Sequence, residues 1–185
     1  MDKNVTQELI KGLRSSPTYL PFWYHYDEKG SFLNDQLIEQ SGWYYFHQHE
    51  LKLLKSESES IMTHIKTPIA LVDIGSGNAV KSRILIDHLL KNEQLRLYVP
   101  VDISKEYLFK TVKELQSEYG SSFNIQPFGC HYFEALAEKR KYQERKLFVW
   151  FGSLQCLSYK DQILYLEEIS GAMEDDDHLL ITVYH

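Results

Sequence analysis

The stretch VDIGSGNAVKSRIL, residues 72–85, joins an apolar run, a glycine turn and an amphipathic segment, which is the pattern of a strand leading into a helix. Gly75 and Gly77 let the turn approach a ligand closely, because a Cβ at either position would crowd it or forbid a positive φ. Val80 stands where a dinucleotide-binding signature needs its third glycine and where a phosphate-binding P-loop needs a glycine before its lysine. The turn therefore predicts either a cradle for a different ligand or a purely structural connection.

Beyond this stretch the chain alternates between short apolar runs and longer amphipathic segments. The apolar runs are rich in β-branched and aromatic residues, and they lie at 69–74, 95–101, 123–128, 146–151 and 178–184. Such alternation is typical of successive βα units around a mostly parallel sheet. We therefore predict an α/β domain over residues 67–185.

Residues 1–66 show a different pattern. Helical periodicity occurs in three segments, 6–15, 31–40 and 47–65. A turn-rich segment, SPTYLPFWYHYDEKG, separates the first two. Many of the aromatic residues lie before residue 50, where they form either a ligand-facing surface or an aromatic core. We predict that residues 1–66 form a helical, aromatic-rich N-terminal extension.

The composition fits one globular domain, because the chain has 185 residues and 43% of them are apolar. The formal charge is −6, and the 20 Lys and Arg are scattered among 26 Asp and Glu, so no basic stripe predicts a nucleic-acid partner. Two cysteines are too few for a disulfide framework and the N-terminus lacks the apolar core of a secretion signal, so we expect a cytoplasmic protein. No apolar run approaches the roughly 20 residues that span a bilayer, so no membrane partner is expected.

A second candidate ligand contact follows the glycine turn. The run VPVDIS places Asp102 at the carboxyl end of the neighbouring predicted strand, at about the spacing at which an acid accepts hydrogen bonds from ribose hydroxyls. The alternative is that Asp102 only precedes a helix that begins after Ser104, where its charge favours the helix dipole. Ligands of such sheets bind beyond the carboxyl ends of the strands, so Gly75, Gly77 and Asp102 would line one crevice.

Four stretches together resemble one family. They are LPFWYHYDEKGSFLNDQLIEQSGWYYFHQHELKLL (20–54), DIGSGNAVKSRILID (73–87), YVPVDISKEYL (98–108) and FGSL (151–154). Their order and spacing resemble those of the histidine Nα-methyltransferases of ergothioneine biosynthesis. The combination of YD and GS with the later PVDIS is far more specific than a Gly-x-Gly turn.

The resemblance implies a Rossmann-like, S-adenosylmethionine-dependent methyltransferase with strand order 3-2-1-4-5, acting on the amine of an amino acid or a similar small molecule. By position it implies cofactor contacts at Gly75, Lys81 and Asp102. We predict that the cofactor site also includes Asp73, Ser76, Gly77, Cys130, Gly152 and Ser153. Gly152 and Ser153 would bring the backbone close to the methyl donor or form a simple turn. Tyr44 or Tyr45 would line the amino-acid pocket, and Tyr45 could act in catalysis by orienting the amine through its hydroxyl.

The chain departs from the family at two positions. Cys130 stands where the family has an aspartate that contacts adenine, and Leu157 stands where it has an asparagine that holds the substrate. These departures favour an alternative function, a non-catalytic methyltransferase-fold subunit that works through protein association. The family also continues past the fifth strand into a substrate-binding domain. We therefore expect either a homo-oligomer or a separate partner that carries that domain.

Two other groups of residues invite a chemical interpretation. His47 and His49 could suggest a metal site, but residues two apart on a helix point about 200° apart and cannot share one ion, so no metal is expected. Cys156 is interpreted as an inert thiol, because no base can be assigned to it.

Overall fold

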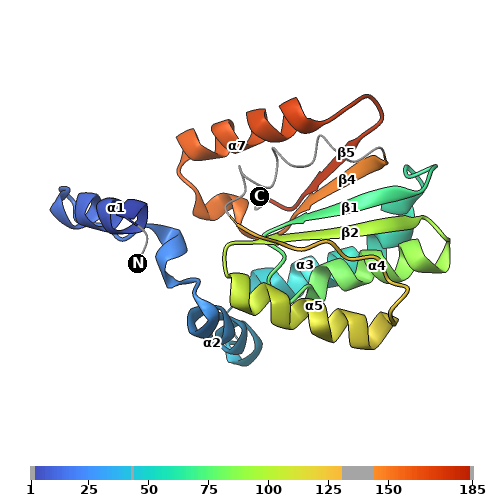
Figure 1. The fold of residues 1–185 in the computed structure, drawn as a ribbon, viewed down its shortest axis with the longest axis horizontal. Helices are drawn as coiled ribbons and strands as arrows, with labels where there is room; N and C mark the ends of the chain where they lie inside the picture. The colour runs from blue at the N-terminus through green and yellow to red at the C-terminus, as the bar shows by residue number, and fades with distance from the viewer. Residues whose placement is uncertain (1–2, 43, 131–143, 184–185) are drawn as a thin grey trace.

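A parallel five-stranded sheet forms the centre of the computed structural model, which describes residues 3–42, 44–130 and 144–183. Its strands are β1 (Ile69–Ile74), β2 (Leu95–Asp102), β3 (Phe128–Gly129), β4 (Arg145–Trp150) and β5 (His178–Ile181). All pairings are parallel, and the order is β3-β2-β1-β4-β5 (Figure 1). The predicted α/β class and strand order are confirmed. β1 lies in the middle of the sheet and is buried throughout, which is why its sequence is almost continuously apolar.

Helices cover both faces of the sheet (Figure 1). On one face lie α3 (Tyr45–Met62), α4 (Val80–Lys91) and α5 (Lys105–Tyr119), and on the other lies α7 (Tyr159–Ala172). Two buried apolar clusters correspond to these faces. The first contains Leu54, Leu85 and Leu115 from the three helices, and the second contains Tyr165 and Ile169 from α7. The sheet is therefore the middle of three layers.

The third strand is shorter than the sequence predicted. β3 consists of Phe128–Gly129, whereas the prediction was 123–128. Around Ile125 the chain does pair with β2, because Tyr98 N donates to Asn124 O and Gln126 N donates to Tyr98 O. The next bond of this ladder would run from the residue 100 N–H to Gln126 O, but residue 100 is a proline without an N–H, so regular pairing resumes only at Phe128.

The three predicted N-terminal helices are present. They are α1 (Lys3–Arg14), α2 (Glu28–Gln40) and α3, and the 3-10 turn η1 (Phe22–His25) lies between the first two. Helix α2 begins three residues earlier than predicted because the Asp27 side chain caps it by accepting a hydrogen bond from Gly30 N at 2.7 Å. α1 stands away from the sheet (Figure 1). Across the described ranges, no helix has the length and apolar character needed to cross a membrane.

Candidate active site

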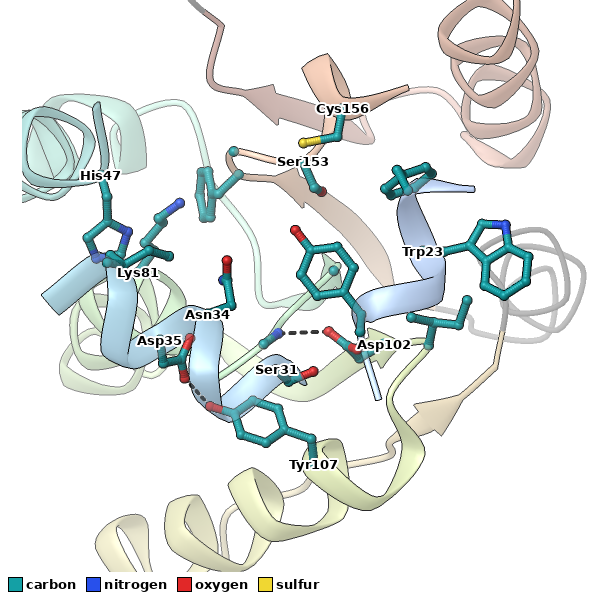
Figure 2. A pocket seen from close by; sticks show the side chains of 18 of the residues that line it. Trp23, Ser31, Asn34, Asp35, His47, Lys81, Asp102, Tyr107, Ser153 and Cys156 are labelled. Atoms are coloured by element: carbon teal, nitrogen blue, oxygen red, sulfur yellow. Dashed lines mark hydrogen bonds between the residues drawn. The ribbon is translucent and has the colours of Figure 1, made fainter. Parts of the chain in front are cut away.

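A cavity lies at the carboxyl ends of β1, β2 and β4 (Figure 2). It brings together seven residues that the sequence singled out: Tyr44, Gly75, Gly77, Lys81, Asp102, Gly152 and Ser153. In Figure 2, Lys81 and Asp102 lie on different sides of the cavity, and Ser153 and Cys156 enter from a third. The location is the one at which parallel α/β sheets bind their ligands.

The glycine turn forms the floor of this cavity. Gly75 and Gly77 have φ angles of 72° and 51°, a region that L side chains rarely adopt. A Cβ at Gly77 would meet no atom within 4 Å, so open space adjoins the turn there. Gly75 N donates to Val101 O at 2.8 Å, which fixes the turn against the end of β2. The turn is therefore hydrogen-bonded to the end of β2 and open on the side of Gly77.

Asp102 holds the other side of the turn. Its Oδ2 accepts a hydrogen bond from Gly77 N at 2.9 Å, and its Oδ1 accepts one from Ser104 N at 2.9 Å. Burial raises the pKa of Asp102, and the two backbone N–H groups partly oppose that rise. Each carboxylate oxygen has a further lone pair, so the group can still accept hydrogen bonds from a ligand.

Lys81 is held by two elements that lie far away in the sequence. Its Nζ forms an ion pair with Glu50 of α3, whose carboxylate is almost fully buried. Gly152 has a φ of 76°, and a Cβ there would lie 2.9 Å from Lys81 Nζ, so the glycine leaves room for the ammonium group. Thr182 Oγ1 donates to the other oxygen of Glu50 and accepts from Gly152 N at 3.2 Å.

The N-terminal residues form the remaining wall. Phe22, Trp23 and Tyr26 contribute aromatic surface, and burial raises the pKa of Tyr26 to about 12, so its hydroxyl stays protonated at neutral pH. Phe46 lines the cavity beside Tyr44. These early aromatic residues therefore line a cavity, and their contact with a ligand stays a prediction.

Asp35 connects helix α2 to the rest of the site by hydrogen bonds. Its Oδ2 accepts a hydrogen bond from the Tyr107 hydroxyl of α5 (Figure 2). The same oxygen accepts a second hydrogen bond from Asn78 Nδ2 at 3.0 Å. Burial raises the pKa of Asp35, and the Tyr107 and Asn78 bonds oppose that rise. This contact closes the cavity on the side of the glycine turn.

Four of the residues predicted to contact ligand are not among those that line the cavity. Asp73 is buried, and its Oδ2 accepts from Ser82 Oγ at 2.5 Å and from the Tyr98 hydroxyl at 2.6 Å. Ser76 is buried and lines a second hollow behind the turn together with Asp73. Cys130 is half-buried and packs against the apolar cluster under α7. The roles predicted for these three residues stay predictions.

Tyr45, the fourth of these residues, lies outside the cavity. Its side chain is 66% exposed, and its ring packs edge-on against His49. The neighbouring Tyr44 does line the cavity. The geometry therefore supports Tyr44 as the pocket tyrosine, while the catalytic role of Tyr45 stays a prediction.

His47 and His49, which could have suggested a metal site, have different surroundings. His47 lines the cavity, and burial together with the nearby Lys81 lowers its pKa. His49 Nδ1 instead contacts Tyr45 O at 2.7 Å. Within residues 3–42, 44–130 and 144–183, no three or more His, Cys, Asp or Glu side chains are grouped so that they could hold a metal ion.

Several residues of the cavity were not singled out from the sequence as ligand contacts. They are Phe22, Trp23, Tyr26, Ser31, Asn34, Asp35, Ile38, Phe46, His47, Glu50, Ile103, Tyr107, Phe151 and Cys156. Ile103 could have been found, because it directly follows Asp102 at the end of β2. Nothing in the spacing of Asp35, Glu50 and Tyr107 points to the cavity, since helix packing alone brings them there.

Solved structures define the class of the fold. The plantazolicin methyltransferase BpumL, solved in complex with a substrate analog and SAH, matches with a TM-score of 0.56 at 13% identity, covering 98% of this chain and 60% of that one. The 1,6-didemethyltoxoflavin-N1-methyltransferase of Burkholderia thailandensis, solved with S-adenosylhomocysteine, matches with a TM-score of 0.54 at 14% identity, covering 92% and 67%. The fold is that of Rossmann-like S-adenosylmethionine-dependent methyltransferases.

The particular family follows from the sequence comparison. The chain belongs to the S-adenosylmethionine-dependent histidine-specific methyltransferases, whose family model matches residues 5–184. It is 32% identical over 176 residues to histidine N-alpha-methyltransferase of Mycobacterium tuberculosis (strain CDC 1551 / Oshkosh), covering 95% of this chain and 54% of that protein. It is 31% identical over 117 residues to 4-dimethylallyltryptophan N-methyltransferase of Claviceps purpurea, covering 63% and 34%. The resemblance drawn from the motifs is confirmed.

Proposed function

We propose that the chain is an S-adenosylmethionine-dependent N-methyltransferase, or the cofactor-binding module of one, acting on the amine of an amino acid or a similar small molecule. The observation that carries this proposal is the convergence of the glycine turn, Asp102 and Lys81 on one cavity. The relatives support it, because the curated ones described above are N-methyltransferases.

The residues of the cavity suit this cofactor. Asp102 has acceptor capacity for two ribose hydroxyls, Lys81 offers a cation for a carboxylate, and the open side at Gly77 admits close contact with the backbone. The side chains of Phe22, Trp23 and Ile103 offer apolar surface for a base. Tyr44 and Tyr26 would then face the acceptor amine.

S-adenosylmethionine supplies an electrophilic methyl group when it is bound. The chain's own residues need to place an unprotonated amine in line with that methyl group and to exclude water, and no strong base is required. The Tyr26 and Tyr44 hydroxyls can orient the amine as hydrogen-bond partners.

One observation favours the alternative, a subunit that does not catalyse. Leu157, at the position where the family has a substrate-binding asparagine, is buried in the apolar cluster with Trp150 and Tyr165. The Leu157 side chain offers no polar contact to a substrate. A partner would then supply it.

We also propose that the chain works in the cytoplasm and with a partner, either a second copy or a polypeptide with the substrate-binding part. The chain spans about half the length of the histidine N-alpha-methyltransferases that it matches. Among the described residues, β5 pairs only with β4 and has one edge free for another strand.

Calorimetry with S-adenosylhomocysteine tests the cofactor assignment directly. We expect micromolar binding, and no heat at millimolar ligand would contradict every cofactor-based function. A methyl-transfer assay with radiolabelled cofactor and a panel of amino acids then separates the two candidates. Tight cofactor binding without transfer to any amine, alone or with a partner, would favour the non-catalytic subunit.

A further inference from the structure

Glu50 is a buried carboxylate in the wall of the cofactor cavity. Only 3% of its surface is exposed, although it lies on a helix of the N-terminal extension. Its Oε1 accepts a hydrogen bond from Thr182 Oγ1. Its Oε2 faces Lys81 Nζ, and within the described part of the chain no hydrogen bond of acceptable geometry reaches this oxygen. The carboxylate is therefore held by Thr182 through one oxygen and paired with the Lys81 cation through the other.

Lys81 is the group that neutralises Glu50. His47, one turn earlier on α3, also faces this region, but burial and the nearness of Lys81 lower its pKa, so its imidazole is neutral at pH 7. Asp35 and Glu39 add negative charge on the side of α2. Among the described residues, Glu50 thus has one ion-pair partner, the Lys81 ammonium group.

This pairing restricts what Lys81 can bind. A ligand that brought only a carboxylate would draw Lys81 away and leave Glu50 buried without a counter-charge, which is strongly unfavourable. A ligand that brings both a carboxylate and an ammonium group can exchange partners with the pair, so that both protein charges stay compensated. The buried pair therefore selects for a zwitterion.

We propose that Glu50 and Lys81 together form the receptor for the zwitterionic amino-acid end of the cofactor, with Glu50 accepting its ammonium group and Lys81 its carboxylate. This proposal rests on the function proposed above and adds Glu50 as a binding residue from the N-terminal extension. The extension is then part of the cofactor site as well as its cover. Thr182 positions Glu50 by fixing its second oxygen.

A calorimetric test compares three ligands that differ in which charged groups of the cofactor they carry. S-adenosylhomocysteine has both charges, its deaminated analogue keeps the carboxylate alone, and 5′-methylthioadenosine has neither. Glu50→Gln keeps the volume of the side chain and an acceptor for Thr182. We expect this variant to bind S-adenosylhomocysteine at least about tenfold more weakly, to bind the deaminated analogue more tightly than the parent chain does, and to bind 5′-methylthioadenosine unchanged.

Glu59→Gln is the matched control, because Glu59 is an exposed residue of the same helix. It should leave all three affinities unchanged. An equal loss for all three ligands in Glu50→Gln, with circular dichroism and thermal unfolding like those of the parent, would overturn the role of Glu50 and leave the proposed function intact. Failure of the parent chain to bind any of the three would instead contradict the proposed function itself.

Discussion

Three acids surround the glycine turn. Glu50 and Asp73 are buried, Asp102 is half-buried, and each has a different kind of partner. Glu50 has the cation of Lys81, Asp102 has two backbone N–H groups, and Asp73 has the hydroxyls of Ser82 and Tyr98. Neutral hydroxyl donors compensate a buried charge least. Burial consequently raises the pKa of Asp73 to about 6, despite the hydrogen bonds that lower it.

Asp73 should make the stability of the fold depend on pH. Because its pKa is higher in the folded chain than the ordinary value of 3.8, the folded state holds this proton more tightly, and stability present at low pH is lost as the pH rises toward 6. We expect the loss to be about 2 to 3 kcal/mol, and we expect Asp73→Asn to abolish it, since Asn does not titrate. Urea unfolding of both chains at about pH 4 and about pH 7 measures the difference. Parallel pH profiles would show that Asp73 is already ionised at low pH.

Asp102 should matter more for the ligand than for the fold. Asp102→Ala removes a charged acceptor for ribose and should weaken binding of S-adenosylhomocysteine by about 1.5 to 3 kcal/mol. It also removes the bond to Gly77 N, so a loss of about 1 kcal/mol in stability is expected. Calorimetry and thermal unfolding on the same preparation separate the two effects. Unchanged affinity in the folded variant would refute the ribose assignment.

At the scale of elements, α2 is a cover held by a few polar contacts. It contributes four residues to the lining of the cavity: Ser31, Asn34, Asp35 and Ile38. Its main polar contact with α5 is the hydrogen bond between Asp35 and Tyr107. Several of its apolar side chains, such as Phe32 and Leu37, are half exposed. An element with little apolar burial opens more readily than the core.

Removal of the Tyr107 hydroxyl should loosen α2. Tyr107→Phe leaves the ring packing unchanged and removes one hydrogen bond to a carboxylate, so amide exchange in residues 28–40 should rise several-fold while global stability changes little. Hydrogen exchange followed by mass spectrometry measures this.

Tyr119→Phe is the matched control for the loosening of α2. It removes a Tyr–Asp bond of the same kind, to Asp87 at 2.7 Å, between α5 and α4. Equal exchange of residues 28–40 in both variants would show that α2 is held by other contacts.

At the scale of the whole molecule, the sheet has an edge at β5 that the described residues leave open. Leu179 and Leu180 point to the two apolar clusters, and Val183, just beyond the strand, is 63% exposed. An apolar strand with unpaired backbone groups tends to recruit another strand. The proposed partner would bind there.

We expect the chain to associate through this edge. Light scattering at micromolar concentration should give a mass above that of the monomer, and Val183→Lys should shift the equilibrium toward the monomer by placing a charge at the edge. Leu53→Lys, on exposed helix surface of α3, should have no effect. A stable monomer that methylates an amino acid unaided would rule out the need for a partner.

The sequence by itself determined the sheet and the positions that follow its strands. A strand buried on both faces needs an almost continuous apolar run, so β1, β2 and β4 were visible as such runs. Strand ends of a parallel sheet meet at one edge, so Gly75 and Asp102 were brought together by topology alone. β3 was predicted too long because Pro100 of the neighbouring β2 has no N–H to pair with Gln126.

Only the tertiary structure decided what faces the cavity from the helices. Glu50 reaches Lys81, and Asp35 reaches Tyr107, through the packing of α3 and α2, and no short-range pattern encodes such a contact. The choice between Tyr44 and Tyr45 depends on where α3 begins. Tyr45 is the first residue of the helix, whereas Tyr44 precedes it with a non-helical backbone, so the two side chains leave the chain in different directions. Leu54 and Met62, several turns further along α3, are buried in the core and fix the helix that follows Tyr44.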